Sequence, residues 1–337
     1  MSRTIGSILH GAYGDYYWQL TSLKLFARRN PGVRLRLYSA SASRMEAIRQ
    51  FDLSFADSVE PWQALLDNSP DEFLQYQVHD IELRQDVLSH LPKQVLAKID
   101  QIHNRIFYRD LLGELPLPAD LRLRLTADGL READRVMEAC GLDADLFDRR
   151  PTLAFLWRYR SAQSAIHPLG QPSPEECIQK YSQAFRRLID DYDCHVLVTG
   201  MKLVTDETNR VRVDAKFSTF GLDLPPERCT YMKGLGWVED LEILSRCTAA
   251  AAMASGFSEA LDTHRGGGVV LLDPPLVYAL KFLKYRVRLF GNMTPSGMWR
   301  TWGARPHTVN RIYHWLAEAL EAGGARRIQR SPNTSKH

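Results

Sequence analysis

The chain has 337 residues, of which 45% are hydrophobic and 25% are charged, and its formal net charge is +3. This composition is typical of a soluble globular protein, and the small positive excess argues against a nucleic-acid-binding surface. The length favours two domains of roughly 150 residues each. No apolar run approaches the roughly 20 residues that a membrane-spanning helix needs.

The cysteines and the first residues indicate the cellular compartment. Five cysteines are scattered through the chain without a Cys-x-x-Cys pair or a histidine cluster at metal-ligand spacing. An odd, dispersed set indicates reduced thiols rather than a disulfide framework. Residues 1–4 lead directly into a strand, which is not the pattern of a signal peptide. We therefore expect a cytoplasmic protein.

The first predicted element is an apolar strand over residues 5–10, which runs into Gly11-Ala12-Tyr13-Gly14-Asp15. A helix is predicted to follow, from about Tyr16 to Arg29. A turn between a buried strand and a helix lies at the carboxyl edge of a sheet, where open α/β sheets bind ligands. Asp15 either caps the helix or points into the cleft as a base, and the later part of the chain favours the base.

Strand and helix patterns alternate from there on. Residues 33–38 alternate apolar and basic side chains, which predicts a strand near a sheet edge. A helix over 43–51, a strand over 58–60 and a helix over 61–66 come next, and helical spacing extends over residues 84–112. Residues 121–125 predict another strand. Thr126 is then the expected N-cap of a helix that runs to Cys140 and ends at Gly141.

A loop over residues 143–150 ends in Pro151, and the same alternation restarts after it. The predicted strands cover 152–157, 194–200, 229–232 and 269–272, and the predicted helices cover 174–189, 235–244 and 308–321. Three glycines at 266–268 favour a turn over a phosphate cradle, because no helix obviously follows them. We predict two Rossmann-like, doubly wound parallel-sheet domains facing each other across a cleft, over residues 1–145 and 146–324, and a disordered tail over 325–337.

A second candidate site follows the apolar run that ends at Met253. The turn Ala254-Ser255-Gly256-Phe257-Ser258-Glu259 leads into a helix, whose N–H groups and two serine hydroxyls suit a diphosphate without a metal. Glu259 would reach ribose hydroxyls, and Arg158 and Arg160 would neutralise the diphosphate from the facing loop. The alternative is a capping arrangement with Ser255 as N-cap and Glu259 complementing the helix dipole. Standard dinucleotide and P-loop motifs are absent from the sequence.

The order of elements resembles that of the GT-B glycosyltransferases, and in closer detail that of the bacterial heptosyltransferase family. The resemblance extends over most of the chain and rests on short motifs. These are Gly14-Asp15, the stretch Gln19-Leu20-Thr21-Ser22-Leu23, Pro31-Gly32-Val33, and Gly141-Leu142 before a proline that opens the second half. A weaker resemblance to fucosyltransferases rests on the Gly-Asp entry and the arginine after the strand over 152–157.

The resemblance implies an acceptor-binding first domain and a nucleotide-sugar-binding second domain. The family's catalytic base corresponds to Asp15. Its donor turn, Asp-Thr-Gly-x-x-His, corresponds to residues 254–259, where Ala254 replaces the acid and Glu259 replaces the histidine. Arg158 or Arg160 would replace the family's phosphate-binding lysine. The expected donor-binding residues are therefore Arg158, Arg160, Ser255, Gly256, Phe257, Ser258 and Glu259, and the expected acceptor-binding residues are His10, Tyr13, Gly14 and Tyr16.

The resemblance implies inverting transfer of a sugar from a nucleotide donor to a hydroxyl of a glycan, glycolipid or small-molecule acceptor. Asp15 would deprotonate the acceptor, and the arginines with the N–H groups of the donor turn would stabilise the leaving group. Such a reaction needs no metal and no cofactor besides the donor substrate. The alternatives are a non-catalytic nucleotide-sugar-binding partner subunit and a nucleotide-sugar epimerase on the same fold.

Two further groups of residues leave alternatives open. The aromatic residues Tyr13, Tyr16, Tyr17 and Trp18 suit either stacking on sugar rings or core packing, and the loop over 292–306 with Trp299 and Trp302 predicts a lid. Arginines gather early in the chain, at Arg28, Arg29, Arg34, Arg36, Arg44 and Arg49. They form either a solvated face or a surface for anionic lipid or an anionic acceptor, which would place the protein peripherally at the inner membrane.

Overall fold

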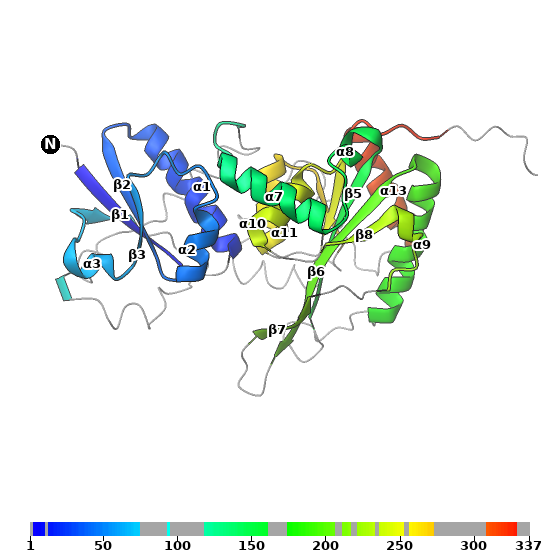
Figure 1. The fold of residues 1–337 in the computed structure, drawn as a ribbon, viewed down its shortest axis with the longest axis horizontal. Coiled ribbons are helices and arrows are strands. Elements are labelled where there is room, and N and C mark those ends of the chain that lie inside the picture. The colour runs from blue at the N-terminus through cyan, green and yellow to red at the C-terminus, as the bar shows by residue number, and fades with distance from the viewer. Residues whose placement is uncertain are drawn as a thin grey trace, which may run out of the picture.

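The computed structural model describes residues 3–10, 13–74, 93–94, 118–160, 174–205, 211–216, 221–232, 236–252, 256–272 and 308–328. At positions 15, 158–160, 174–175, 200–205, 211–216, 256, 259 and 271 the description covers the backbone alone. Two β-sheets stand at some distance from each other, and helices from both halves of the chain fill the space between them (Figure 1). The predicted α/β class is confirmed.

The first sheet has the strand order β3-β2-β1-β4, and all its pairs are parallel. Its strands are β1 (Arg3–Leu9), β2 (Val33–Ser39), β3 (Ser58–Pro61) and β4 (Glu72–Phe73). The helices between them are α1 (Tyr13–Arg29), α2 (Ala42–Ile48) and α3 (Ala64–Asp67). Strand β2, expected near a sheet edge, lies one strand in from it, because it pairs with β1 and with the edge strand β3. Its exposed Arg34 side chain is accommodated by an ion pair with Asp57.

The second sheet has the order β10-β9-β5-β6-β7, and β8 also pairs with β6. Its strands are β5 (Thr152–Arg160), β6 (His195–Thr205), β7 (Val211–Lys216), β8 (Cys229–Tyr231), β9 (Ala249–Ala252) and β10 (Val269–Leu271). The pairs are parallel except for β6 with β7, which form an antiparallel hairpin that the sequence analysis did not predict. In Figure 1 this hairpin extends away from the body of the sheet.

Helices cover both faces of the second sheet. They are α7 (Ala127–Ala139), α8 (Leu146–Arg149), α9 (Pro174–Tyr192), α10 (Trp237–Ser245), α11 (Gly256–Arg265) and α13 (Val309–Ala322), with a 3-10 turn at Pro226–Arg228. Strand β5 shows the division. Leu153, Phe155 and Trp157 join the outer core with α9 and α13, whereas Ala154 and Leu156 join the inner core with α10 and α11. This alternation follows from the period of two in a strand.

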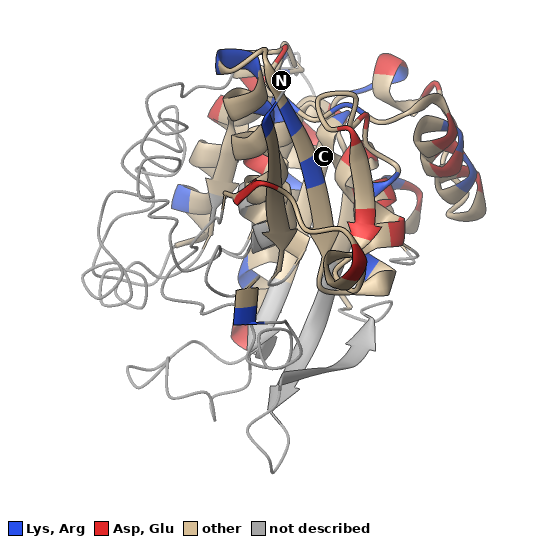
Figure 2. Ribbon diagram, turned by 90° about the vertical axis from the view of Figure 1, so that its left-hand side faces the viewer, with Lys and Arg blue, Asp and Glu red and all other residues tan. Residues whose placement is uncertain are grey.

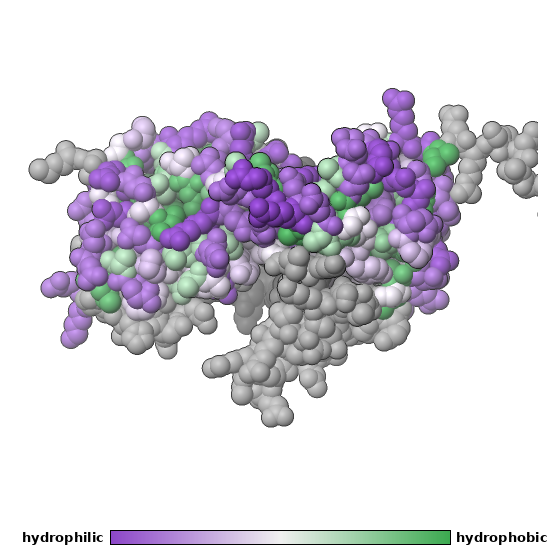
Figure 3. Space-filling view, viewed as in Figure 1, coloured by the Kyte–Doolittle hydropathy of each residue, from purple (hydrophilic) through white to green (hydrophobic). Residues whose placement is uncertain are grey.

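The inner core continues without a break into the first half of the chain. It contains Leu20 and Leu23 of α1 together with Val238 of α10, Leu261 of α11 and Val136 of α7. Helix α7 therefore lies against α10, and its outward face is strongly hydrophilic in Figure 3. The domain boundary expected between residues 145 and 146 stays a prediction, because one apolar core spans the two halves.

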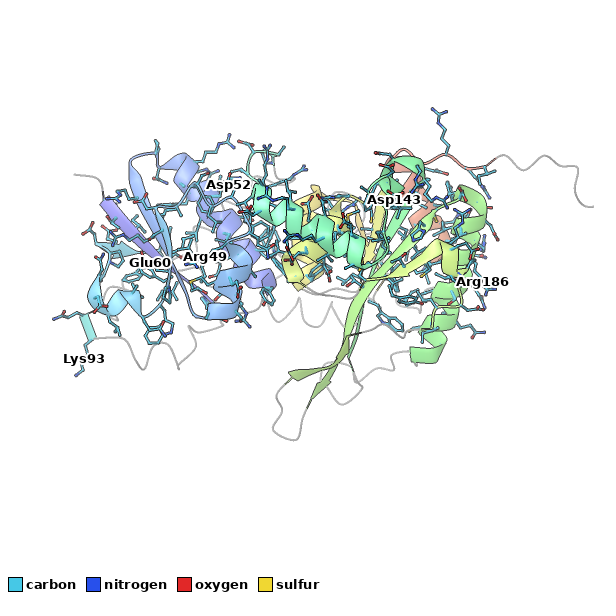
Figure 4. All side chains as sticks on the ribbon, in the orientation of Figure 1. Arg49, Asp52, Glu60, Lys93, Asp143 and Arg186 are labelled. Carbon is cyan, nitrogen blue, oxygen red and sulfur yellow. The ribbon has the colours of Figure 1, made fainter. Side chains whose placement is uncertain are left out.

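The strand predicted over residues 121–125 is wrong. Leu121, Leu123 and Leu125 are buried as the alternation implies, but the only ladder contact in the described chain at this segment is one bridge between Leu125 and Phe51. Individual hydrogen bonds hold the backbone of this segment instead. The Arg122 carbonyl accepts from Lys24 Nζ at 2.7 Å, and the Arg124 carbonyl accepts from the amide of Asp52, which Figure 4 labels beside α7. Here the alternation of apolar residues correctly indicates burial, although the segment has no partner strand in the described part of either sheet.

The predicted ends of α7 are confirmed. The Thr126 side chain caps α7 by accepting from the Gly129 amide at 3.1 Å, and the chain leaves that helix through Gly141 at φ 71°. The segment over residues 266–268 is a turn, as expected. Its three glycines all have positive φ, between 83° and 109°, a region that other residues rarely adopt. Residues 325–328, placed in the tail by the sequence analysis, include Ile328, whose amide donates to the Asp191 carbonyl.

The early arginines are partly neutralised by acidic neighbours. Arg28 pairs with Asp120 at 2.8 Å, Arg34 pairs with Asp57, and Arg49 donates to the Val59 carbonyl. Figure 2 shows basic and acidic residues intermingled over this end of the molecule. The solvated-face alternative accounts for these contacts, and attraction to anionic lipid stays a prediction.

The turn between α11 and β10 depends on one buried carboxyl group. Asp262 is 3% exposed, and its Oδ1 accepts from the Val269 amide at 3.0 Å. Burial raises the pKa of Asp262 to about 7 from its ordinary 3.8, although the amide and Arg265 oppose the shift. Between these two values the folded protein binds a proton that the unfolded chain has released, so stability falls as pH rises toward 7.

We therefore predict that Asp262→Asn raises the free energy of unfolding at pH 8 by roughly 2–4 kcal/mol and leaves it nearly unchanged at pH 4. The asparagine Oδ1 keeps the bond to Val269, so the turn is retained. Urea denaturation at both pH values measures the difference. The exposed Asp128→Asn is the control and should show no such pH dependence. An equal gain at both pH values would contradict the role of the ionised carboxyl.

Candidate functional site

The strand order identifies one ligand-binding edge in each sheet. In the first sheet β2 and β4 flank β1, and in the second sheet β6 and β9 flank β5. In the first sheet the chain therefore continues to opposite sides of β1, and in the second sheet it continues to opposite sides of β5. Ligands of open α/β sheets bind outside the carboxyl ends of strands at such switch points. Helix α1, which contains Asp15, follows β1, and α11 with the predicted donor turn follows β9.

The two switch points come together through three aromatic rings. The Tyr13 ring stacks on Trp237, with centroids 5.3 Å apart and planes at 18°, and Trp237 meets Phe257 edge-on at 5.9 Å. These residues stand in the first turns of α1, α10 and α11, respectively. The first-turn N–H groups of a helix lack helical acceptors and carry partial positive charge. The meeting of three helix starts therefore forms a region that suits an anionic ligand.

Helix α1 begins at Tyr13, three residues earlier than the predicted Tyr16. Gly14 and Asp15 therefore lie inside its first turn and not in the loop before it. Asp15 is not the N-cap, which answers half of the question that the sequence left open. Its side chain lies outside the described part of the structure, so its role as a base stays a prediction.

The neighbouring acceptor-side residues are buried. Tyr16 is fully buried, and its hydroxyl lies 3.0 Å from Ser39 Oγ. His10 is 2% exposed, and its backbone amide and carbonyl are both bonded to the Gln19 side chain. The burial of Tyr16, Tyr17 and Trp18 favours core packing over stacking on a sugar for these rings. Tyr13 is half-buried at the junction and keeps that predicted role.

The predicted donor residues occupy the start of α11 and the end of β5. Helix α11 begins at Gly256, Phe257 is half-buried, and Ser258 is fully buried. The backbone of Glu259 lies in the same first turn, whereas Ser255, its side chain and the lid segment 292–306 fall outside the described residues. Strand β5 continues through Arg158 and Arg160, which pair with Met201 and Leu203. The two arginines are thus in the sheet and not in a loop, because the unpredicted hairpin extends β6.

Trp237 is the site residue that the sequence analysis did not identify. It is the first residue of α10, and it contacts rings from both halves of the chain: Tyr13, Tyr17, Phe51 and Phe257. The available signal was the position of an aromatic residue directly after Gly236, at the start of a helix that follows a strand. That signal does not reveal which distant rings the tryptophan meets.

Two buried carboxylates lie in the first turn of α10 behind Trp237. Glu239 is 6% exposed and accepts from Gln50 Nε2 at 2.7 Å, a bond that joins the two halves. Asp240 is 7% exposed and accepts from Thr199 Oγ1 at 3.2 Å. The positive end of the helix dipole favours both negative charges. A Cβ at Gly236 would lie 1.8 Å from Glu239 Oε2, so the carboxylate fits over this helix start because residue 236 is glycine.

Arg44 places a cation at the first-half edge of the junction. Its guanidinium carbon lies 5.7 Å from the ring centroids of Tyr13 and of Tyr16. Burial raises the pKa of the Tyr16 hydroxyl above its ordinary value, and Ser39 and Arg44 oppose this shift in part. The tyrosine is therefore neutral, and the positive charge of Arg44 remains beside the junction.

The described residues contain neither a metal-binding cluster nor a membrane-spanning helix. No cluster of three or more histidine, cysteine, aspartate or glutamate side chains is arranged there to hold a metal ion. In the same part of the chain, none of the helices has the length and apolarity to cross a lipid bilayer.

Comparison with known proteins identifies the fold. No family model matches the chain, and no curated protein matches its sequence. Among solved structures, E. coli ADP-heptose lipopolysaccharide heptosyltransferase II matches with a TM-score of 0.56 at 13% identity, covering 96% of this chain and 100% of that one. E. coli heptosyltransferase WaaC with ADP gives a TM-score of 0.47 at 9% identity, covering 95% and 99% of the two chains. A putative UDP-N-acetylglucosamine 2-epimerase from Listeria monocytogenes gives 0.43 at 12%, covering 95% and 88%.

The match to heptosyltransferase II confirms the predicted fold, two Rossmann-like domains of the GT-B type, and confirms the resemblance to the heptosyltransferases at the level of the fold. At this identity the similarity concerns the chain path. What the site does follows from its own residues.

We predict that Trp237→Ala lowers the free energy of unfolding by about 2–4 kcal/mol, because it removes a half-buried ring that contacts four aromatic neighbours. Trp237→Phe should lose less, since it retains part of the contact. Urea denaturation measures both. Trp315→Ala on α13 is the control, because it removes a tryptophan from the other core. This variant should leave unchanged any rise in melting temperature that a bound ligand produces. A Trp237→Ala variant as stable as the parent would contradict the bridging role.

Proposed function

We propose that this protein is a glycosyltransferase that moves a sugar from a nucleoside diphosphate donor to an acceptor hydroxyl. The observation that carries the proposal is the meeting of the two switch points. The first turn of α1, with Asp15, and the first turn of α11 both contact Trp237 through an aromatic ring. A transferase needs this arrangement because its donor and acceptor bind to different sheets and must react with each other.

The second half is proposed to bind the donor. The N–H groups at the start of α11 would hold the diphosphate, as the start of a helix favours phosphate groups. Ser258 is fully buried and would support this turn through its packing. Arg158 and Arg160 at the end of β5 would neutralise the diphosphate, and Glu259 would accept from ribose hydroxyls. Ala254 stands where the heptosyltransferase pattern has an acid, and it leaves the diphosphate without a nearby negative charge from that position.

The first half is proposed to bind the acceptor. Asp15 would remove the proton from the attacking hydroxyl while the donor diphosphate leaves on the opposite side of the sugar, which inverts the anomeric centre. Charge that develops on the leaving diphosphate would be stabilised by the arginines and the helix start, so the reaction does not require a metal ion. Tyr13, half-buried at the junction, would contact the acceptor or the transferred sugar.

A thermal-shift panel of nucleoside diphosphates and their sugars tests the donor site. One nucleotide is expected to raise the melting temperature, because a ligand that binds only the folded state stabilises it by mass action. Glu259→Ala should weaken that shift by removing an acceptor for hydroxyl groups. The absence of a shift with every nucleotide would overturn the proposed function.

Turnover tests the base. Asp15→Asn should retain the nucleotide-induced shift and reduce sugar transfer by about 10²–10⁴-fold, the usual contribution of a general base. Asp67→Asn makes the same change on an exposed residue of α3 in the same half and should leave transfer unchanged. Nucleotide-sugar conversion that requires no acceptor would identify an epimerase, and nucleotide binding without turnover would identify a binding subunit.

A further inference from the structure

A buried hydrogen bond joins the two halves one turn behind the candidate site. The hydroxyl of Tyr17 on α1 lies 3.0 Å from Nδ1 of His264, the penultimate residue of α11. Tyr17 is fully buried, and the His264 side chain is 8% exposed. Neither residue belongs to the predicted catalytic, donor-binding or acceptor-binding sets.

The other nitrogen of His264 is held by a second group. Nε2 lies 3.1 Å from Glu242 Oε2, and Glu242 Oε1 accepts from Arg246 Nε at 3.1 Å. Arg246 in turn pairs with Asp134 of α7 at 2.8 Å. Burial tends to raise the pKa of Glu242, but the bonds from His264 and Arg246 outweigh it, so that the net pKa is lowered.

Glu242 therefore determines the tautomer of His264. An ionised carboxylate only accepts hydrogen bonds, so in the neutral form of the ring the proton lies on Nε2. In that form Nδ1 is an acceptor, and the Tyr17 hydroxyl donates to it. The chain from Tyr17 to Asp134 links α1, α11, α10 and α7 through bonds whose donors and acceptors are complementary.

The surroundings of the hydrogen bond between Tyr17 and His264 make its loss energetically costly. The His264 ring meets Tyr17 and Phe51 edge-on, at 6.0 Å and 6.5 Å between centroids. Trp237 also contacts both Tyr17 and Phe51. In a low-dielectric environment a hydrogen bond is strengthened, and a partner left without its bond is costly. The contact between the halves is thus polar at this point and aromatic around it.

Two contacts along α1 fix its orientation relative to α11. The first is at Tyr13, which reaches Phe257 through Trp237, and the second is at Tyr17, four residues or about 6 Å further along the helix. The apolar core that Leu20 and Leu23 share with the second half is non-directional and does not by itself fix this orientation. Two contacts, at both ends of the first full turn, hold the segment that contains Asp15 in one orientation.

We infer that Tyr17 and His264 are positioning residues: their buried hydrogen bond, with Glu242 fixing the histidine tautomer, clamps the first turn of α1 against α11. The clamp itself is a property of the fold. Its consequence for sugar transfer rests on the proposed function, because only then does the orientation of Asp15 relative to the donor turn set a rate.

Hydrogen exchange tests the clamp without reference to activity. Tyr17→Phe removes one oxygen atom, so folding is expected to survive. Amide exchange in peptides from both α1 and α11 should accelerate about 5-fold, the factor that corresponds to one net hydrogen bond. The matched control is Tyr38→Phe, another buried tyrosine, whose hydroxyl bonds to the Asn68 carbonyl within the first half. Unchanged α11 exchange in Tyr17→Phe, or equal acceleration in Tyr38→Phe, would overturn the inference.

Steady-state kinetics test the consequence. With the nucleotide sugar identified by the thermal-shift panel, Tyr17→Phe and His264→Ala should each lower kcat about 5-fold or more and leave the KM for the donor within 2-fold. The double variant should be no slower than the slower single variant, because both remove the same bond. A rise in donor KM with unchanged kcat would contradict positioning. If no variant and not even the parent transfers sugar, the proposed function fails, while the exchange result still decides the clamp.

Discussion

The burial of one face of α1 against α10 and α11 is the constraint on which the rest of the structure depends. Leu20 and Leu23 of α1 share one apolar core with Val238 and Leu261 of the second half. Removal of apolar surface from water is in general the dominant favourable contribution to such packing. It is non-directional, however, and would hold the two sheets together in many orientations.

Polar groups buried in the junction select one orientation among these. Gln50 bonds to Glu239, and Tyr17 bonds to His264, each from one half to the other. A slip of one helix past the other would separate these partners and leave them buried without bonds, which costs more than the net gain of forming them. The apolar face thus supplies the attraction, and the polar pairs supply the register in which the two helix starts meet.

Short stretches of sequence determine the individual strands, helix caps and turns. The period of two in the strand over 152–157 and the Thr126 cap identify elements from neighbouring residues alone, and the glycines at 266–268 identify a turn that other residues would strain. The predictions that fail concern which segments pair with each other. The apolar alternation over 121–125 indicates burial but does not indicate a pairing strand. The hairpin of β6 and β7 forms from two segments, and neither segment alone specifies that they pair. The sequence places the start of α1 too late, because glycine at position 14 obscures the first turn.

For the site, the sequence by itself determined that a Gly-Asp pair follows one buried strand and a small-residue turn follows another, because a strand followed by a helix is a local pattern. Only the tertiary structure decided that these two helix starts face each other, that Trp237 lies between them, and that Tyr17 meets His264. Those contacts join residues more than 200 positions apart, and their formation depends on how two separately patterned sheets bury their helices against each other. No periodicity within either half contains that information.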